Sequence, residues 1–430
     1  MRFPSPRNLG SSMTTMIRPS TLVLFFIFVV AWTRVSAADW PGWRGPTGQG
    51  ICEEKDLPLA WNAKTSENIL WKVKLPGQDG MHDQDRNQSS PIVIHGRVIV
   101  TVSYWPGKVN PAEFPEHHVA CYQAGDGKPL WDTLLPPGPW KLTDLRGGYT
   151  APTPASDGER VYVLFGSSVL AALDLDGKIV WRKEITPYQF DVAIGTSPVL
   201  FEDMLILQCD QVSHKSFLVA FDRKTGAQRW LQKRPEAGFS HSTPTLVTIQ
   251  GKSQLLLAGS DALQGVDPAN GNVLWSCPAK GDTVSPVLAD GIIYCDSGRG
   301  GPALAVEVGK STPKWKIPNV PEGFSSPVIA DGYIYRLHNP GILKCWKLSD
   351  GKEMFSERLA GVSTASSPFT TPDGRVYLAS SGKSYVIKAG PKLEVLAVND
   401  LNDGSEASPA VTGSRIFLKG RQYLCCVGKK

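Results

Sequence analysis

The fold is decided by residues 285–315, which read SPVLADGIIYCDSGRGGPALAVEVGKSTPKW. A Ser-Pro step opens this stretch, three hydrophobic β-runs follow, and a tryptophan ends it. The Asp290-Gly291 step suits a two-residue hairpin, because aspartate and glycine tolerate the positive φ that such a turn demands. The stretch therefore predicts four short antiparallel strands, at residues 287–289, 292–295, 303–308 and 314–316.

The same phrase occurs eight times along the chain. Its copies open at Ser90, Thr153, Ser197, Thr243, Ser285, Ser326, Ser367 and Ser408, each followed by proline. After the first copy, which carries an insertion, most successive openings lie 41 to 46 residues apart. A period in the low forties, made of short strands, is typical of β-propeller blades. We therefore predict an all-β, eight-bladed propeller of four-stranded antiparallel blades; the alternative is seven blades, if the degenerate copy after Ser367 forms none.

The eighth copy reaches the end of the chain before its fourth strand. We expect residues 68–75, NILWKVKL, to supply that strand, because they have a strand pattern and carry Trp71. Pairing of this N-terminal strand with the last copy would close the ring and leave no free sheet edge at the seam. The propeller is thus predicted over residues 68–430.

The third turn of each copy carries a recurrent motif. Residues 220–230 follow the pattern A-x-D-x-x-T-G-x-x-x-W, and residues 265–275 follow nearly the same pattern. The aspartate can accept hydrogen bonds from the turn, the glycine takes the left-handed conformation, and the tryptophan then packs between adjacent blades. The predicted blade-docking residues are Trp71, Trp131, Trp181, Trp230, Trp275, Trp315 and Phe355.

The N-terminus predicts a signal peptide over residues 1–37. Arginines precede the apolar run LVLFFIFVVAW at 22–32, and the small residues of Val35-Ser36-Ala37 follow it. That run is too short to cross a bilayer as a helix, which takes about 20 residues, so an uncleaved anchor is only the alternative. We expect cleavage after Ala37, a periplasmic or secreted protein, and an N-terminal extension over residues 38–67.

The net charge of +5 belongs mostly to this leader, which holds four arginines and no acidic residue. The mature chain is therefore nearly neutral. This balance gives no electrostatic basis for binding nucleic acid or an anionic membrane.

The eight cysteines recur at no common blade position. Export permits disulfides, but several of the cysteines fall in predicted strands, where a buried thiol packs as a small apolar residue. Cys425 and Cys426 are the one adjacent pair, either ordinary strand residues or a vicinal disulfide.

The turn motifs resemble the tryptophan-docking repeats of the pyrroloquinoline-quinone (PQQ) dehydrogenase superfamily. Residues 39–50, DWPGWRGPTGQG, are similar to the opening segment of bacterial secreted PQQ-like repeat proteins. The resemblance covers about residues 39–430 and implies the propeller fold. The same repeats occur in enzymes and in non-catalytic scaffolds, among them the lipoprotein of the outer-membrane β-barrel assembly machinery.

For the enzymes of this superfamily, the resemblance implies PQQ on the propeller axis, a Ca²⁺ held by carboxylate and amide oxygens, a catalytic aspartate and an early vicinal disulfide. Here the adjacent cysteines lie at the end of the chain, and no residue set matches the calcium ligands. We therefore transfer no catalytic residue and predict no cofactor or metal.

Three short motifs suggest other sites. The segment Asp174-Leu-Asp176-Gly177 resembles the start of a calcium loop, but Ile185 stands where a bidentate glutamate is needed, so we interpret it as a turn. His117-His118 is expected in a solvated loop rather than a metal site. Asn87-Gln-Ser89 is a glycosylation sequon.

The loops that enter the innermost strands should gather around the axis, where propellers commonly bind ligands. Long excursions at 77–88 and 136–149 lie on this side, and long ordered loops tend to carry function. The alternative is that these loops are polar only because they are solvated. The candidate ligand-binding residues of this axial rim are Arg86, Arg146, Tyr149, Asp191, His241 and Asp282.

These features predict an exported, monomeric, non-catalytic scaffold that binds a protein partner or a small ligand on its axial face. The alternative is a PQQ- and calcium-dependent quinoprotein oxidoreductase of alcohols or sugars.

Overall fold

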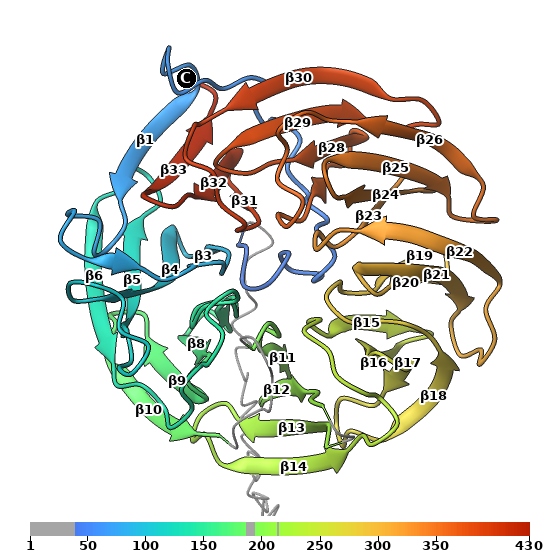
Figure 1. Ribbon diagram of the computed structural model, residues 1–430, viewed down its shortest axis with the longest axis horizontal. Helices are drawn as coiled ribbons and strands as arrows, with labels where there is room; N and C mark the ends of the chain where they lie inside the picture. Colours follow the sequence, from blue (N-terminus) through green and yellow to red (C-terminus); the bar gives the residue numbers. More distant parts are fainter. Residues whose placement is uncertain (1–38, 186–193, 213–214) are drawn as a thin grey trace, which may run out of the picture. The chain divides into compact units, whose positions relative to one another are not determined.

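The computed structural model describes residues 39–185, 194–212 and 215–430. These residues form 33 β-strands, grouped in eight antiparallel sheets that surround a common centre (Figure 1). This arrangement confirms the predicted all-β propeller with eight blades, and it excludes the seven-bladed alternative. In the described residues no helix is long and apolar enough to cross a membrane.

In each blade the innermost strand begins just after one of the Ser-Pro or Thr-Pro steps. Blade 1 has a fifth strand, because the short β2 also pairs with β4. Blades 1 to 4 consist of β2 (Asp83–Gln84), β3 (Ile92–Ile94), β4 (Arg97–Trp105), β5 (Glu116–Gln123) and β6 (Pro129–Leu135); β7 (Ala155–Ser156), β8 (Arg160–Phe165), β9 (Val169–Asp174) and β10 (Ile179–Glu184); β11 (Val199–Phe201), β12 (Met204–Cys209), β13 (Phe217–Asp222) and β14 (Gln228–Lys233); and β15 (Thr245–Ile249), β16 (Lys252–Ala258), β17 (Ala262–Val266) and β18 (Val273–Pro278).

The second half of the ring repeats this plan, and the copy after Ser367 forms a complete blade. Blades 5 to 8 consist of β19 (Val287–Ala289), β20 (Ile292–Asp296), β21 (Arg299–Glu307) and β22 (Trp315–Glu322); β23 (Val328–Ala330), β24 (Tyr333–His338), β25 (Ile342–Lys347) and β26 (Glu353–Arg358); β27 (Phe369–Thr370), β28 (Arg375–Leu378), β29 (Lys383–Lys388) and β30 (Glu394–Asp400); and β31 (Ala410–Thr412), β32 (Arg415–Lys419), β33 (Tyr423–Gly428) and β1 (Ile69–Lys74).

The two ends of the propeller sequence meet in blade 8. Strand β1 pairs antiparallel with β33, with Trp71 opposite Cys426, and the Gly428 amide donates to the Asn68 carbonyl at 3.0 Å. In Figure 1 the blue β1 lies beside the red β33. The prediction that an N-terminal strand completes the last blade is confirmed.

The hub of the ring, which we define as the eight Ser or Thr residues that precede the blade prolines, is a closed circle of hydrogen bonds. The backbone N–H of each donates to the side-chain oxygen of its counterpart in the next blade, at 2.9 to 3.2 Å. The last bond runs from Ser408 back to Ser90. The repeated hydroxyl therefore supplies the acceptor that a buried backbone N–H needs.

At the rim, the outer edge of the ring, tryptophans connect the blades. The indole N–H of Trp71 donates to the Ala124 carbonyl of blade 1 at 3.0 Å, and Trp131, Trp181 and Trp315 make the equivalent bond. A Cβ at Gly127 would lie 2.8 Å from the Trp71 ring, so only glycine fits against the docked indole.

Trp275 departs from this arrangement. Its N–H donates to Gln254 of its own blade at 3.0 Å, and its ring covers Gly265, whose Cβ would lie 2.1 Å from it. The turn that should receive it, at Gly309, lacks the aspartate of the motif, and a Cβ there would meet nothing within 4 Å. Phe355, which replaces tryptophan in blade 6, packs against Tyr335 at 6.4 Å between ring centroids.

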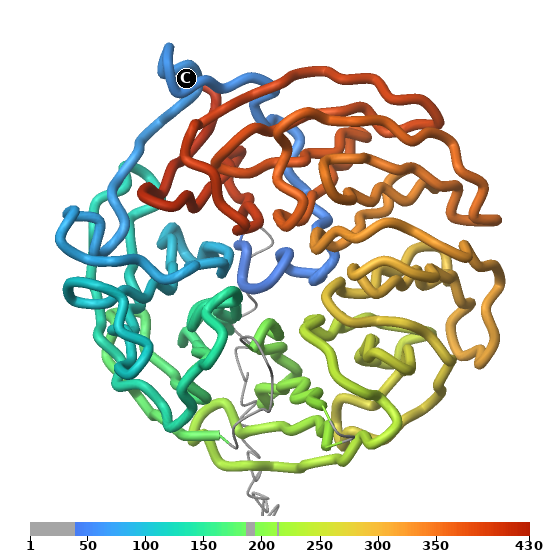
Figure 2. The backbone as a smooth tube through the Cα atoms, in the orientation of Figure 1, coloured from blue at the N-terminus to red at the C-terminus, as the bar shows by residue number. Residues whose placement is uncertain are grey.

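The N-terminal extension crosses the middle of the ring, as the blue tube in Figure 2 shows. Trp40 pairs with Val93 of blade 1, and the Pro41 carbonyl accepts from the Ser156 amide of blade 2. The Gly50 carbonyl accepts from the Thr370 amide of blade 7, and the Cys52 amide donates to the Thr370 carbonyl. Arg44 is buried and donates to the Pro327 carbonyl of blade 6 at 2.5 Å, and burial lowers its pKa to about 9. The extension is thus an internal brace between distant blades.

All eight cysteines are free and buried. Cys425 and Cys426 follow one another in β33, and burial raises the pKa of each thiol to about 12. Both are therefore protonated thiols near neutral pH.

Candidate functional site

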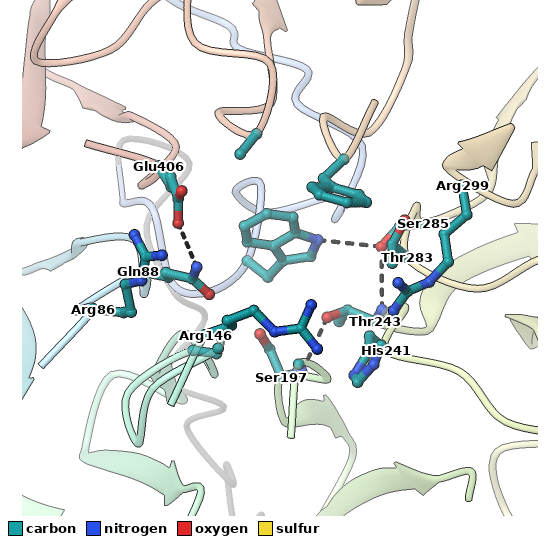
Figure 3. Close-up of a pocket in the computed structure, with 16 residues that line it drawn as sticks. Arg86, Gln88, Arg146, Ser197, His241, Thr243, Thr283, Ser285, Arg299 and Glu406 are labelled. Atoms are coloured by element: carbon teal, nitrogen blue, oxygen red, sulfur yellow. Dashed lines mark hydrogen bonds between the residues drawn. The ribbon is translucent and has the colours of Figure 1, made fainter. Parts of the chain in front are cut away.

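Loops from all eight blades meet in a cavity of about 400 Å³ at the axis, which we call the axial pocket (Figure 3). Most of its lining residues immediately precede the first strand of a blade, because the hub prolines hold the entering loops around the centre. The lining residues are Trp43, Arg86, Gln88, Arg146, Gly147, Ala151, Gly195, Ser197, His241, Thr243, Thr283, Ser285, Arg299, Phe324, Ala365 and Glu406.

The hub forms part of the wall of the axial pocket. Ser197, Thr243 and Ser285 belong both to the hub and to the lining. Trp43 of the N-terminal extension also lines the pocket, and its indole N–H donates to the Ser285 hydroxyl at 3.3 Å. The pocket is therefore built on the most regular part of the ring.

Arg299 is held in place from three sides. Its Nε donates to the buried Asp282 carboxylate, and its guanidinium carbon lies 5.8 Å from the Phe239 ring and 6.0 Å from the Phe324 ring. A guanidinium has five N–H donors, so the bond from Nε leaves those on the two terminal nitrogens. Arg299 is thus a preorganised donor at the pocket.

Arg146 reaches the pocket from the loop before blade 2. Its Nε and Nη2 donate to the Asp144 carboxylate at 2.8 and 2.6 Å, and these bonds lower the pKa of Asp144. The side chain is 72 % exposed and extends toward the middle of the pocket in Figure 3. Arg86 and His241 are the other basic residues of the lining.

Among the described residues, one acidic side chain lines the axial pocket, that of Glu406 before blade 8. Gln88 donates its amide N–H to this carboxylate. In Figure 3 this pair and Arg86 lie on the side opposite Arg299.

The structure brings together three of the predicted axial-rim residues, Arg86, Arg146 and His241. Asp282 is only 4 % exposed and serves Arg299 rather than facing the pocket directly. Tyr149 does not line the pocket: it is 1 % exposed, and its hydroxyl accepts from the Leu142 amide at 3.0 Å. Asp191 lies outside the described residues.

The candidate set also omitted residues that line the pocket. Arg299 was missed because it opens the third strand of blade 5 rather than a loop before a first strand; its flanking glycines, 298, 300 and 301, were the available signal. Trp43 was missed because the extension carries no repeat. Phe324 and Glu406 lie in the predicted axial loops and were not selected.

A second cavity of about 850 Å³ lies beside the junction of blades 8 and 1, and we call it the seam pocket. It shares Arg86 and Glu406 with the axial pocket. Its lining residues are Gln78, Gln84, Asp85, Arg86, Asn87, Trp105, Val109, Leu145, Asn402, Asp403, Gly404, Ser405, Glu406, Gly420, Arg421 and Gln422.

Two buried ionisable groups lie in and beneath the seam pocket. Asp85 accepts from the Ser103 hydroxyl at 2.7 Å and the Tyr149 amide at 2.5 Å, and burial raises its pKa. Lys419 is also buried and donates to the Ser89 hydroxyl at 2.7 Å; burial lowers its pKa to about 7, against the opposing effect of the Asp85 charge. Lys419 of β32 thus bonds to Ser89, the residue before the hub serine of blade 1.

The other short motifs have structural roles. Asp174 accepts from the amides of residues 176 and 178, as the turn interpretation predicts. The loop interpretation of the histidine pair is wrong, because both residues lie in β5; His117 is buried, and burial lowers its pKa to about 3. Asn87 of the sequon is 5 % exposed and bonds to Ser103, so it offers no accessible site for a glycan.

The oxygen ligands available around the axial pocket show whether the site could bind calcium. In the part of the chain that the structure describes, no group of three or more His, Cys, Asp or Glu side chains could hold a metal ion. Glu406 is the carboxylate of the axial lining, and the residues around it are mainly basic or neutral. The described residues thus present donors for an anion and do not fit the six to eight oxygen ligands that calcium prefers.

The sequence model of one protein family, described as outer membrane protein assembly factor BamB, matches residues 115–357, which are more than half of the chain. The chain therefore belongs to this family of PQQ-like propellers. A search of curated proteins found no significant match.

Solved structures with the same fold include BamB and two dehydrogenases. BamB from Moraxella catarrhalis has a TM-score of 0.58 and 12 % identity, covering 84 % of this chain and 98 % of that one. Quinohemoprotein alcohol dehydrogenase from Comamonas testosteroni has a TM-score of 0.64 and 14 % identity, with coverages of 91 % and 81 %. A europium-containing methanol dehydrogenase has a TM-score of 0.63 and 11 % identity, with coverages of 90 % and 89 %. At these identities the likeness concerns the fold alone.

Proposed function

We propose that this protein is an exported, non-catalytic binding propeller whose axial pocket takes an acidic group of a ligand or partner. The observation that carries the proposal is the convergence of Arg86, Arg146, Arg299 and His241 on one cavity built on the hub. A cavity of about 400 Å³ falls within the usual range of about 300–1,000 Å³ for small-ligand sites.

Guanidinium groups suit this role because their planar fork matches the two oxygens of a carboxylate. Arg299 is fixed by Asp282 and two phenylalanine rings, so little conformational entropy is lost when it binds. The family of the chain supports a binding role, since its model is described as that of an assembly factor.

The proposal is tested with carboxylated compounds and their neutral amide or alcohol analogues, by thermal shift and isothermal titration calorimetry. We expect the carboxylates alone to raise the melting temperature, and Arg146→Gln to weaken binding about tenfold, since one charge-assisted hydrogen bond contributes about 1.5 kcal/mol. Arg358→Gln, on the exposed end of β26, is the matched control. Equal effects of charged and neutral compounds would refute the axial anion site.

Export is proposed from the sequence of residues 1–37, and it is tested by fractionation of expressing cells and N-terminal sequencing. We expect the mature chain to begin at Ala38 and to leave the cytoplasm. A full-length chain in the cytoplasm would contradict this part of the proposal.

The quinoprotein alternative predicts an oxidoreductase activity, which a dye-reduction assay would detect. The basic lining would accept the carboxylates of PQQ, whereas the described residues do not supply the calcium ligands. The protein should therefore reduce no dye when given PQQ, Ca²⁺ and alcohol or sugar substrates. Dye reduction that EDTA abolishes would replace the binding proposal with an enzymatic one.

A further inference from the structure

The axial and seam pockets adjoin, because Arg86 and Glu406 line both of them. We propose that together they form one groove that binds an acidic oligosaccharide, with a sugar carboxylate in the axial pocket and hydroxyl groups along the seam pocket. This inference rests on the proposed anion-binding role of the axial pocket and adds the chemical class of the ligand.

The axial end of the groove selects the acidic group. Arg146 and Arg299 present guanidinium donors there, and the shared Arg86 stands at the boundary with the seam pocket. The nearby Trp43 and Phe324 provide apolar surface against which the carbon face of a sugar ring can pack. This end therefore suits a ring that carries a carboxylate.

The seam end has a different chemistry. Four accessible carboxamide side chains line it, those of Gln78, Gln84, Asn402 and Gln422, with the buried Asn87 behind them. A carboxamide both donates and accepts hydrogen bonds, as a hydroxyl group does, so the two are complementary. The exposed Glu406 carboxylate can accept from hydroxyls and repels a second acidic group, whereas Asp85 and Asp403 are buried and hold the wall. The axial end of the groove therefore favours an acidic group, and the seam end favours hydroxyl groups.

Several groups of the seam wall are fixed before a ligand arrives. Asn87 accepts from the Ser103 amide at 2.8 Å and donates to its carbonyl at 3.2 Å. Asp403 accepts from the amides of Gln422 and Tyr423, at 3.1 and 3.0 Å to its two oxygens. Such anchored groups lower the entropic cost of binding.

The dimensions favour a ligand of more than one ring. The axial pocket alone has the volume of a small-ligand site, and the seam pocket of about 850 Å³ more than doubles it. A peptide long enough to fill both pockets is usually held by an open sheet edge or by apolar side-chain pockets. The carboxamide-rich seam offers hydroxyl partners instead, so we favour the saccharide.

The test is calorimetric titration of the full mature chain with glucuronic acid and with a dimer, trimer and tetramer that carry one terminal glucuronic acid on neutral sugars, together with the carboxyl-reduced forms of these oligomers. We expect affinity to rise at least tenfold from monomer to trimer and the reduced oligomers not to bind. Arg146→Gln should weaken every length about tenfold. Gln422→Leu should leave the affinity for the monomer unchanged and remove most of the increase in affinity with oligomer length.

Arg358→Gln and Gln228→Leu, both on exposed parts of the rim, are the matched controls, and the melting temperature of each unligated variant verifies its folding. If the monomer binds and the longer oligomers bind no more tightly, the groove is refuted and the axial anion site stands. If simple dicarboxylates or glutamate-rich peptides bind and sugar acids do not, the saccharide class is wrong. If no carboxylate binds, the proposed function fails together with this inference.

Discussion

The hub and the rim connect the same eight blades in different ways. At the hub, every junction uses the same bond, from a backbone N–H to the next Ser or Thr hydroxyl, and the circle closes without a gap. At the rim, Trp71, Trp131, Trp181 and Trp315 bond to the next blade, whereas Trp275 turns back onto its own. The inner connection is uniform and the outer one is variable.

The difference follows from the kind of interaction at each place. A buried N–H without an acceptor costs about 1–3 kcal/mol, so each hub position requires a hydroxyl. Apolar packing tolerates changes of shape when the volume is roughly conserved. The rim can therefore replace tryptophan with Phe355 or reorient Trp275, and the ring still closes.

The largest expected effect is at the rim of the seam. Trp71→Ala should lower the free energy of unfolding by about 3–5 kcal/mol, because it leaves a cavity between β1 and blade 1. Trp275→Ala should lower the free energy of unfolding by clearly less, since the Trp275 ring makes its hydrogen bond within its own blade. Urea denaturation of both variants measures the contrast; equal losses would mean that docking onto the next blade adds nothing.

A second pair of variants separates docking from backbone strain. Gly177 and Gly309 have φ of 85° and 78°, so alanine at either costs about 1–2 kcal/mol. A Cβ at Gly177 also lies 2.6 Å from the Trp131 ring, whereas one at Gly309 meets nothing within 4 Å. Gly177→Ala should therefore cost about 1–3 kcal/mol more than Gly309→Ala. Melting curves that coincide would show that the indole yields without cost.

At the hub, Ser367→Ala should cost about 1–3 kcal/mol, because it removes the acceptor for the Ser326 amide. Ser367→Thr should restore stability, since Thr153 and Thr243 serve as hub acceptors. Ser356→Ala, on an exposed face of β26, is the control. Hydrogen exchange of the Ser326 amide measures the effect directly. If the Ser326 amide exchanges equally slowly in the alanine variant, the hub hydrogen bond does not contribute to stability.

A pH-dependent effect is expected at the seam beside the hub. Lys419 has a pKa lowered to about 7 in the folded protein, against about 10.4 when unfolded. The unfolded chain binds more protons between these values, so Lys419 makes stability rise with pH there, by up to about 1.4 kcal/mol per pH unit. Lys419→Met should gain most stability at pH 7 and below, and the gain should fade toward pH 10.

Denaturation of both proteins at several pH values from 6 to 9 measures this difference. Comparison of the two chains cancels the titration of the buried cysteines and tyrosines. Parallel stability curves would show that Lys419 titrates normally.

The ring was predictable from sequence because its features repeat. Eight Ser/Thr-Pro openings gave the number of blades, and the strand pattern with Trp71 identified the closing strand. The N-terminal extension was predictable only as a segment, because Trp43 and Arg44 lie in a unique stretch whose partners, such as Pro327, are remote in sequence.

The axial pocket was predictable in part. Loop position before a first strand identified Arg86, Arg146 and His241, but it could not separate exposed from buried side chains. Tyr149 turns inward to bond with Leu142, and Asp282 is covered by Arg299. Arg299 reaches the pocket from the start of β21, where Asp282 holds its guanidinium.

The pairing of β1 with β33 also sets an order of events during folding. Ribosomes make β1 first, and its partner is among the last residues to be added, so β1 waits with an open edge while the other blades assemble. Contacts between such remote segments form slowly and leave intermediates prone to aggregation. If the chain is exported, pairing of β1 with β33 only after transport would keep the polypeptide unfolded enough to pass through a translocation pore.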